Sequence, residues 1–261
     1  LHDALPISLK NKKQNYTEIF AHRGFKAVAP ENTMPAFQKA IEAGADGIEI
    51  DLHFSRDNEL IIIHDEFVDR TTNATGLVKN YTLKELKKLD AGSWFSPEFK
   101  NTRIPTFKEL LAYLSSIKYK GQLLIEIKTD HIKYQGIEEA ILKTISEYRP
   151  HTFSIIYQSF NPQSIQIVKK LKPDARTAIL TYTISPFNWY QYFRHNIEAI
   201  HPDKRILFNR AFFFNESKAN IKPWVVNSKI ELTKIFKRGL RGVITNDVAK
   251  AVEIRNEIQN G

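Results

Sequence analysis

The chain has 261 residues, of which 42% are apolar, and a formal net charge of +9. Its aromatic content argues against disorder, and its length suits one large α/β domain. The absence of Cys excludes a disulfide framework, a thiol nucleophile and a zinc–thiolate site, and no apolar run approaches the ~18 residues of a membrane span. The scattered lysines lack a nucleic-acid-binding motif, so we predict no nucleic-acid partner. We interpret them as a solvated surface, with weak attraction of phosphates or anionic lipid as the alternative.

The first eight residues are interpreted as non-native. Residues 1–7 are what a widely used sequencing adapter would encode if translated, and Ser8 stands at the join. We therefore exclude 1–8 from the fold, take 9–18 as a lead-in and expect a single domain over 19–261. The short lead-in favours a bacterial cytoplasmic location, and a signal peptide or anchor lost upstream is the alternative.

Apolar runs alternate with helical patterns along the whole chain, which indicates a parallel α/β architecture. Eight runs are candidate strands, and eight is the number that closes a barrel. These runs are 19–22, 47–52, 122–128, 153–158, 178–182, 199–201, 223–226 and 242–245. The sequence therefore predicts a single (β/α)8 TIM barrel.

Helical patterns lie between these strands. Thr33 is the predicted N-cap of the first helix, and another helix is expected at 107–114. Between them, turn residues and a short helical pattern predict a small insertion at about 66–105, between strand 2 and its following helix. We expect this insertion to lie over the barrel mouth. Three consecutive Phe at 212–214 are either buried or a lipid-facing lip.

Three short segments place a titratable side chain at the end of an apolar run. The three runs lead into His22, Glu49 and His64. Alternate residues of a strand share a face, so Glu49 and Asp51 point the same way. Two such carboxylates would repel each other without a cation between them, and oxygen ligands favour Ca²⁺ or Mg²⁺. Two histidines nearby could supply one base and one acid, which is the outline of a metal-assisted hydrolase.

Six short motifs occur in order along the chain. They are His22-Arg23-Gly24, Pro30-Glu31-Asn32-Thr33, Glu49-Ile50-Asp51, His64-Asp65, Arg70-Thr71-Thr72 and Glu126-Ile127-Lys128. In order and spacing the set resembles the glycerophosphodiester phosphodiesterase family, and the similarity runs from about residue 19 to residue 252. The resemblance implies metal-dependent hydrolysis of glycerophosphodiesters, such as glycerophosphocholine, to glycerol 3-phosphate and an alcohol.

The resemblance also implies roles for single residues. Glu49, Asp51 and Glu126 match the positions that hold one divalent cation, either Ca²⁺ or Mg²⁺, and His22 and His64 match the catalytic pair. In the implied mechanism a neutral histidine takes the proton of the glycerol 2-hydroxyl, which attacks phosphorus. The other histidine protonates the leaving alcohol, and water then opens the cyclic phosphate. The sequence leaves open which histidine plays which part.

Further residues are predicted around this centre. Arg23 should bind phosphate oxygens, Lys128 should add a second positive charge, and Trp224 should contact the glycerol, with an ordinary place in the core as its alternative. His53 shares the face of the two strand carboxylates, and we expect it at the mouth or behind the site without being a ligand. Residues 31–33 are expected to cap the first helix and brace the site.

Two other functions stay open at this point. A lysophospholipase D would share the same site but would need an apolar groove, for which the Phe run at 212–214 is the hint. A catalytically silent barrel that only binds ligands should lack a histidine or a metal carboxylate, and none is missing. The sequence does not choose the head group or the oligomeric state.

Overall fold

The computed structural model describes residues 16–183, 197–208 and 220–260. The predicted non-native segment 1–8 and the Phe run at 212–214 lie outside the described residues. In the described part of the chain, no helix combines the length and the apolar character that crossing a membrane requires.

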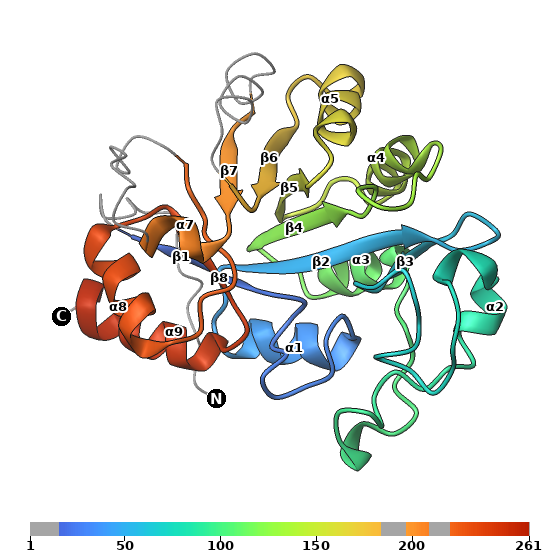
Figure 1. Cartoon of the computed structure of the whole chain (residues 1–261), viewed down its shortest axis with the longest axis horizontal. Coiled ribbons are helices and arrows are strands. Elements are labelled where there is room, and N and C mark those ends of the chain that lie inside the picture. Colours follow the sequence, from blue (N-terminus) through green and yellow to red (C-terminus); the bar gives the residue numbers. More distant parts are fainter. Residues whose placement is uncertain (1–15, 184–196, 209–219, 261) are drawn as a thin grey trace.

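The described strands form one eight-stranded curled sheet (Figure 1). Its order is β7-β6-β5-β4-β2-β1-β8 with all neighbours parallel, and β3 pairs antiparallel with β2. The strands are β1 Glu18–Ala21, β2 Gly47–Phe54, β3 Leu60–Ile62, β4 Gln122–Ile127, β5 Ser154–Ser159, β6 Arg176–Thr181, β7 Ala199–Pro202 and β8 Gly242–Thr245. The parallel α/β class agrees with the sequence prediction, whereas β3 was not among the predicted strands.

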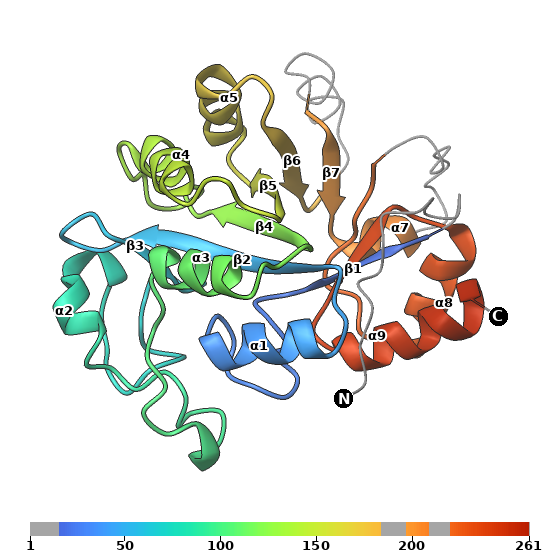
Figure 2. The same ribbon diagram turned by 180° about the vertical axis from the view of Figure 1, so that it is seen from behind.

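The larger helices lie outside the curl of the sheet (Figures 1 and 2). Their bounds are α1 Met34–Glu42, α3 Phe107–Ser116, α4 Ile137–Glu147, α5 Pro162–Leu171, α8 Lys229–Arg238 and α9 Val248–Arg255. Two short helices are α2 Leu83–Leu86, which lies beyond the end of β2, and α7 Lys204–Phe208. The shorter turns are η1 Val78–Asn80, η2 Pro97–Phe99 and η3 Asn256–Asn260. Thr33 occupies the N-cap position of α1, but its hydroxyl donates to the Pro30 carbonyl at 2.6 Å. Thr33 is therefore the N-cap as predicted, although its side chain makes no capping hydrogen bond, and Pro35 in the first turn has no amide proton to donate to it.

The predicted strand at 223–226 is not a regular strand. Pro223 lacks an amide proton and cannot continue a hydrogen-bonded ladder. The backbone of 220–226 still bonds on both sides. The Trp224 amide donates to a β7 carbonyl at 3.0 Å, and the Val226 amide donates to a β8 carbonyl at 3.0 Å. This irregular segment therefore links the two end strands of the sheet order.

The interior of the curl contains a layer of apolar side chains from six strands. These are Phe20, Leu124, Ile156, Ala178, Ala199 and Ile244, and Trp224 packs against them. Residues two positions further along a strand share the same face. The next layer, on β2, β4, β5 and β7 and directly after β1 and β8, holds polar residues, which are described below. Apolar packing thus forms the floor beneath the polar end of the sheet.

A long connection separates β3 from α3. Residues 63–106 run beyond the C-terminal end of β2 (Figures 1 and 2). They contribute to a small apolar cluster of their own, made of Ile61, Ile63, Val68, Val78, Leu86, Ala91 and Ile104. His64 and Asp65 begin this connection, so part of the predicted site lies on it and part on the strands.

Candidate active site

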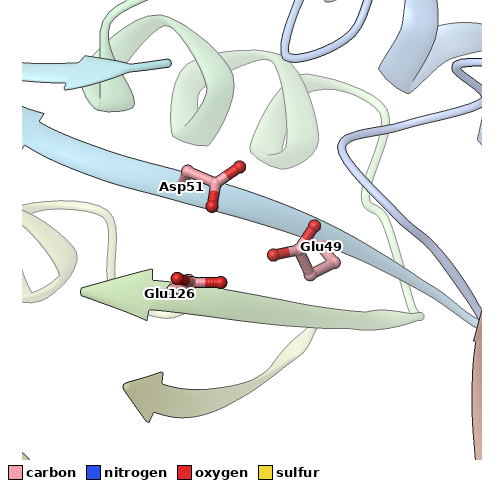
Figure 3. A group of neighbouring side chains, drawn as sticks. All are labelled: Glu49, Asp51 and Glu126. Carbon is pink, nitrogen blue, oxygen red and sulfur yellow. The ribbon is translucent and has the colours of Figure 1, made fainter. Parts of the chain in front are cut away.

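Three buried carboxylates gather at the C-terminal end of the sheet. Asp51 and Glu126 are direct partners in the register of β2 with β4, and Glu49 lies two residues before Asp51 on the same face. One ligand oxygen from each of the three lies within 4.8 Å of the others. Figure 3 shows the carboxylates turned toward one another between the two strands. The structure therefore brings together the three residues predicted to hold a metal.

The three carboxylates bring negative charge close together in a buried place. Burial, and then the neighbouring carboxylates, raise the pKa of Glu49 well above its ordinary value. Burial also disfavours the charged form of Asp51, but His64, Arg23 and Lys128 hold its pKa at about 2. The Asp51 Oδ1 atom is buried without a hydrogen-bond donor. Three buried carboxylates, one of them with an oxygen that accepts no hydrogen bond, suit a hard divalent cation.

Two cationic side chains border the carboxylates. The Arg23 amide donates to Glu49 Oε2 at 2.8 Å, and its Nε lies 3.4 Å from Asp51 Oδ2. Its Nη1 donates to Glu31 at 2.8 Å. Lys128 Nζ donates to Glu126 at 2.9 Å. Both predicted substrate-binding cations therefore lie in the cluster, where carboxylates hold them.

His22 follows directly after β1 and is half-buried. Its Nδ1 lies 2.7 Å from Asn246 Oδ1, and because an amide oxygen accepts, Nδ1 carries the proton and Nε2 has the free lone pair. Burial lowers the pKa of His22 well below its ordinary value, and Arg23 and Lys26 lower it further. Burial and the neighbouring cations therefore favour the neutral form of the His22 imidazole.

His64 has a different partner. Its Nδ1 lies 2.6 Å from Asp65 Oδ1, and Asp65 in turn accepts from Arg70 Nε at 2.7 Å. Arg70 also donates to Glu31 at 2.7 Å, and Glu31 holds Arg23. Although burial opposes it, these bonds keep the pKa of both Asp65 and Glu31 well below the usual range. A charged network thus runs from His64 back to the metal-site cluster.

A buried chain of polar groups supports Glu49 from the other side. Gln158 Nε2 donates to Glu49 Oε1 at 3.4 Å, so its Oε1 is free to accept from His201 Nδ1 at 2.7 Å. The Trp224 indole donates to the His201 carbonyl at 2.7 Å. Gln158 and His201 each end one of the predicted apolar runs, which is the signal that could have identified His201 from the sequence.

Trp224 belongs to a group of three aromatic rings. Its ring centroid lies 5.5 Å from that of Phe160 and 5.3 Å from that of Tyr182, in both cases edge to face. Phe160 and Tyr182 stack at 4.9 Å. Trp224 is half-buried and Tyr182 is exposed. This aromatic wall lies at the same end of the sheet as the carboxylates.

His53 is fully buried and lies behind the site. Its two ring nitrogens contact the Tyr134 hydroxyl at 3.1 Å and the His64 carbonyl at 3.0 Å. Burial lowers its pKa to about 4. Both nitrogens are engaged, in agreement with the expectation that His53 is not a ligand.

The sequence prediction named the central residues and missed most of their supports. Asn32 Nδ2 donates to Asp51 at 2.8 Å, which agrees with the bracing expected of residues 31–33. The roles of Asn246 as the partner of His22 and of Arg70 as the partner of Asp65 were not predicted. Arg70 occurs in a recognised motif and Asn246 at a strand end, so both carried a positional signal, but neither showed its partner.

Comparison with known proteins agrees with this geometry. The glycerophosphoryl diester phosphodiesterase family matches residues 22–250. A glycerophosphodiester phosphodiesterase of Caldanaerobacter subterraneus subsp. tengcongensis is 38% identical over 241 residues, covering 88% of this chain and 94% of the relative. A putative glycerophosphodiester phosphodiesterase of Bacillus subtilis is 39% identical, with 87% and 93% covered.

Solved structures are similar over nearly the whole chain. A phosphodiesterase of Oleispira antarctica, solved with the product sn-glycerol-3-phosphate, superposes with a TM-score of 0.80 at 26% identity, covering 91% of this chain and 96% of that one. A glycerophosphodiester phosphodiesterase of Thermotoga maritima gives a TM-score of 0.71 at 27% identity, with 92% and 99% covered.

Proposed function

The chain belongs to the glycerophosphoryl diester phosphodiesterase family, and we propose that it hydrolyses glycerophosphodiesters to glycerol 3-phosphate and an alcohol with one divalent cation. The observation that carries this proposal is the meeting of three buried carboxylates with two differently paired imidazoles at one end of the sheet. The Oleispira antarctica structure with bound sn-glycerol-3-phosphate supports the identity of the product.

Glu49, Asp51 and Glu126 would hold the cation. Their buried oxygens, their mutual repulsion and the unpartnered Asp51 Oδ1 fit such an ion. When bound, the cation would neutralise charge on the phosphate oxygens. The donor set suits Ca²⁺ and Mg²⁺ equally in chemistry.

The hydrogen-bond partners of the two histidines indicate which one would act as the base and which as the acid. His22 is neutral, and Asn246 fixes its proton on Nδ1, so His22 Nε2 is our candidate base for the glycerol 2-hydroxyl. The hydroxyl oxygen then bonds to phosphorus as the bond to the alcohol breaks. His64, whose Nδ1 contacts the Asp65 carboxylate, would give a proton from its other ring nitrogen to the departing alcohol. Water opens the resulting cyclic phosphate with the two roles reversed.

Two cationic and three aromatic residues would bind the substrate. Arg23 and Lys128 lie at the carboxylate cluster and would contact phosphate oxygens as the substrate enters. The aromatic wall of Phe160, Tyr182 and Trp224 would pack against the carbon atoms of the glycerol unit.

The deciding experiment is a coupled assay for glycerol 3-phosphate release, with and without a chelator. We expect release from glycerophosphocholine, glycerophosphoethanolamine or glycerophosphoglycerol, loss of release with chelator, and recovery when Ca²⁺ or Mg²⁺ is restored. Release of lysophosphatidic acid from lysophospholipids in place of these reactions would favour the lysophospholipase D alternative. If the folded, metal-loaded protein is inactive on both substrate classes, the proposal is contradicted. The catalytically silent barrel that only binds ligands would then be the better account.

The finer points of architecture and location are also proposals. We take segment 220–226 as the irregular eighth member of a (β/α)8 barrel, because its backbone bonds to both β7 and β8. Residues 63–106, which include the whole of the predicted insertion at 66–105, would form one wall of the mouth. The bacterial cytoplasmic location remains a prediction, for which cell fractionation is the direct test.

A further inference from the structure

The catalytic candidate His64 lies beyond the end of a very short strand. β3 ends at Ile62, and after it the Ile63 amide donates to the Asp51 carbonyl at 3.2 Å. No backbone amide of the described residues donates to the His64 carbonyl. The sheet ladder therefore does not determine the orientation of the peptide that follows His64.

The buried side chain of His53 makes a hydrogen bond to the His64 carbonyl, which receives none from the sheet. His53 Nε2 lies 3.0 Å from the His64 carbonyl oxygen, and a carbonyl can only accept, so Nε2 carries the proton. His53 Nδ1 lies 3.1 Å from the Tyr134 hydroxyl, and in the neutral ring it must accept the proton of that hydroxyl. The chemistry of the two partners thus defines one tautomer of a side chain with no exposed surface.

We propose that His53 is a positioning residue that holds the His64 backbone, and through it the His64 imidazole, in its catalytic orientation. His53 lies on β2, the strand that also provides Glu49 and Asp51, so its bond ties the connecting segment to the strand of the carboxylate cluster. Tyr134, which is buried and packs edge to face on the His53 ring at 5.7 Å, keeps that ring from turning. This inference rests on the proposed role of His64.

Two substitutions test the roles of the two ring nitrogens of His53 separately. Gln places an amide nitrogen near the position of Nε2 and can still donate to the His64 carbonyl. Asn reaches only as far as Nδ1 and cannot. We expect His53→Asn to lower kcat about tenfold or more, because small misplacements of a reacting group are costly, and His53→Gln to stay within about threefold of the wild type. KM should change little in both variants, because the role concerns the chemical step.

Controls separate positioning from folding. The thermal midpoints of the Asn and Gln variants should be similar, because both lose one of two comparable hydrogen bonds. His151→Gln is the matched control, because it breaks a ring-to-carbonyl bond of 2.7 Å to Phe153 at the opposite end of the sheet. It should leave kcat unchanged. In a His64→Ala background, adding His53→Asn should cause no further loss, because the two residues act as one unit.

Equal kcat values for the Asn and Gln variants, or an undiminished Asn effect in the His64→Ala background, would overturn the inference. An NMR readout keeps the test independent of activity. Long-range ¹H–¹⁵N spectra should show His53 as the Nε2–H tautomer, and the His64 ring signals should shift in His53→Asn but not in His53→Gln. If the wild type is inactive on every diester but these spectra hold, the proposed function fails while the positioning contact stands. If the His64 signals are unmoved in both variants, the contact itself is refuted.

Discussion

The two halves of the site are built in different ways. Glu49, Asp51 and Glu126 lie on neighbouring strands, where the β2–β4 register determines their separation. His64 lies beyond the short strand β3, and a chain of side-chain bonds through Asp65 and Arg70 holds it. The strand half, made of the three carboxylates, is held in place by the backbone hydrogen bonds of the sheet. The loop half, which contains His64, is held by a few charged side chains. Substitutions should therefore affect the two halves differently.

The largest effect is expected from the two histidines. His22→Ala and His64→Ala should each lower kcat by roughly 10²–10⁴-fold, the usual scale of general acid–base catalysis. The double variant should lose much less than the product of the single losses, because the pair acts as a unit. Steady-state kinetics on glycerophosphocholine is the measurement, with His151→Ala as the folded control. Near-normal activity of either folded single variant would contradict the two-histidine mechanism.

A smaller and partly reversible loss is expected on the strand half. Glu49→Gln should lower kcat/KM by about 10²-fold at low cation concentration, because it removes a charged ligand from the metal site. Raising Ca²⁺ or Mg²⁺ should restore part of the activity, whereas His64→Ala should gain nothing. Glu59→Gln, in the turn between β2 and β3, is the matched control and should behave as wild type. If a high cation concentration does not raise the activity of the Glu49 variant, this carboxylate does not bind the metal.

Changing the partner of His22 should move the acidic limb of the pH profile. Asn246→Asp places a carboxylate beside His22, which raises the pKa of the base, so the acidic limb of kcat/KM should move up by about one pH unit. In the wild type, the lowered pKa of His22 should keep the acidic limb below about 6.5. The pH dependence of kcat/KM in the two proteins is the measurement. An acidic limb that stays in place in the variant would rule out His22 as the base.

The smallest effect concerns stability. Arg70 helps to hold the pKa of Glu31 and Asp65 below their unfolded values, so their contribution to the free energy of unfolding is present above about pH 4 and is lost as pH falls through the folded values. Arg70→Met should lower this free energy by about 1 kcal/mol at pH 7, because Arg70 is half-exposed and solvent screens its pairs. The difference from wild type should shrink as pH falls.

Denaturant unfolding at several pH values measures this effect. Arg56→Met is the comparison, because its pair with Glu85 is more exposed on both sides and should contribute less. An Arg70 variant whose deficit stays constant down to low pH would show that the loss is one of packing and not of charge.

Much of the sheet could be predicted from the sequence. The alternating apolar runs identified all the parallel strands within a few residues, and the polar residues after those runs marked the functional end. The antiparallel strand β3 was missed because three residues are too few for periodicity to detect. The segment at 223–226 was predicted as regular because its apolar composition suggests a strand, although Pro223 interrupts the ladder. Local pattern therefore identified the elements more reliably than their pairing.

The sequence by itself determined which side chains could do chemistry. The two-residue period of a strand places Glu49 and Asp51 on one face whatever the rest of the fold does. The tertiary structure decided which partners those side chains meet. Glu126 stands opposite Asp51 only through the β2–β4 register, and His22 meets Asn246, 224 residues later, only because β1 pairs with β8. Such partnerships depend on strand order and loop path, which packing of the whole chain sets and which no local pattern encodes.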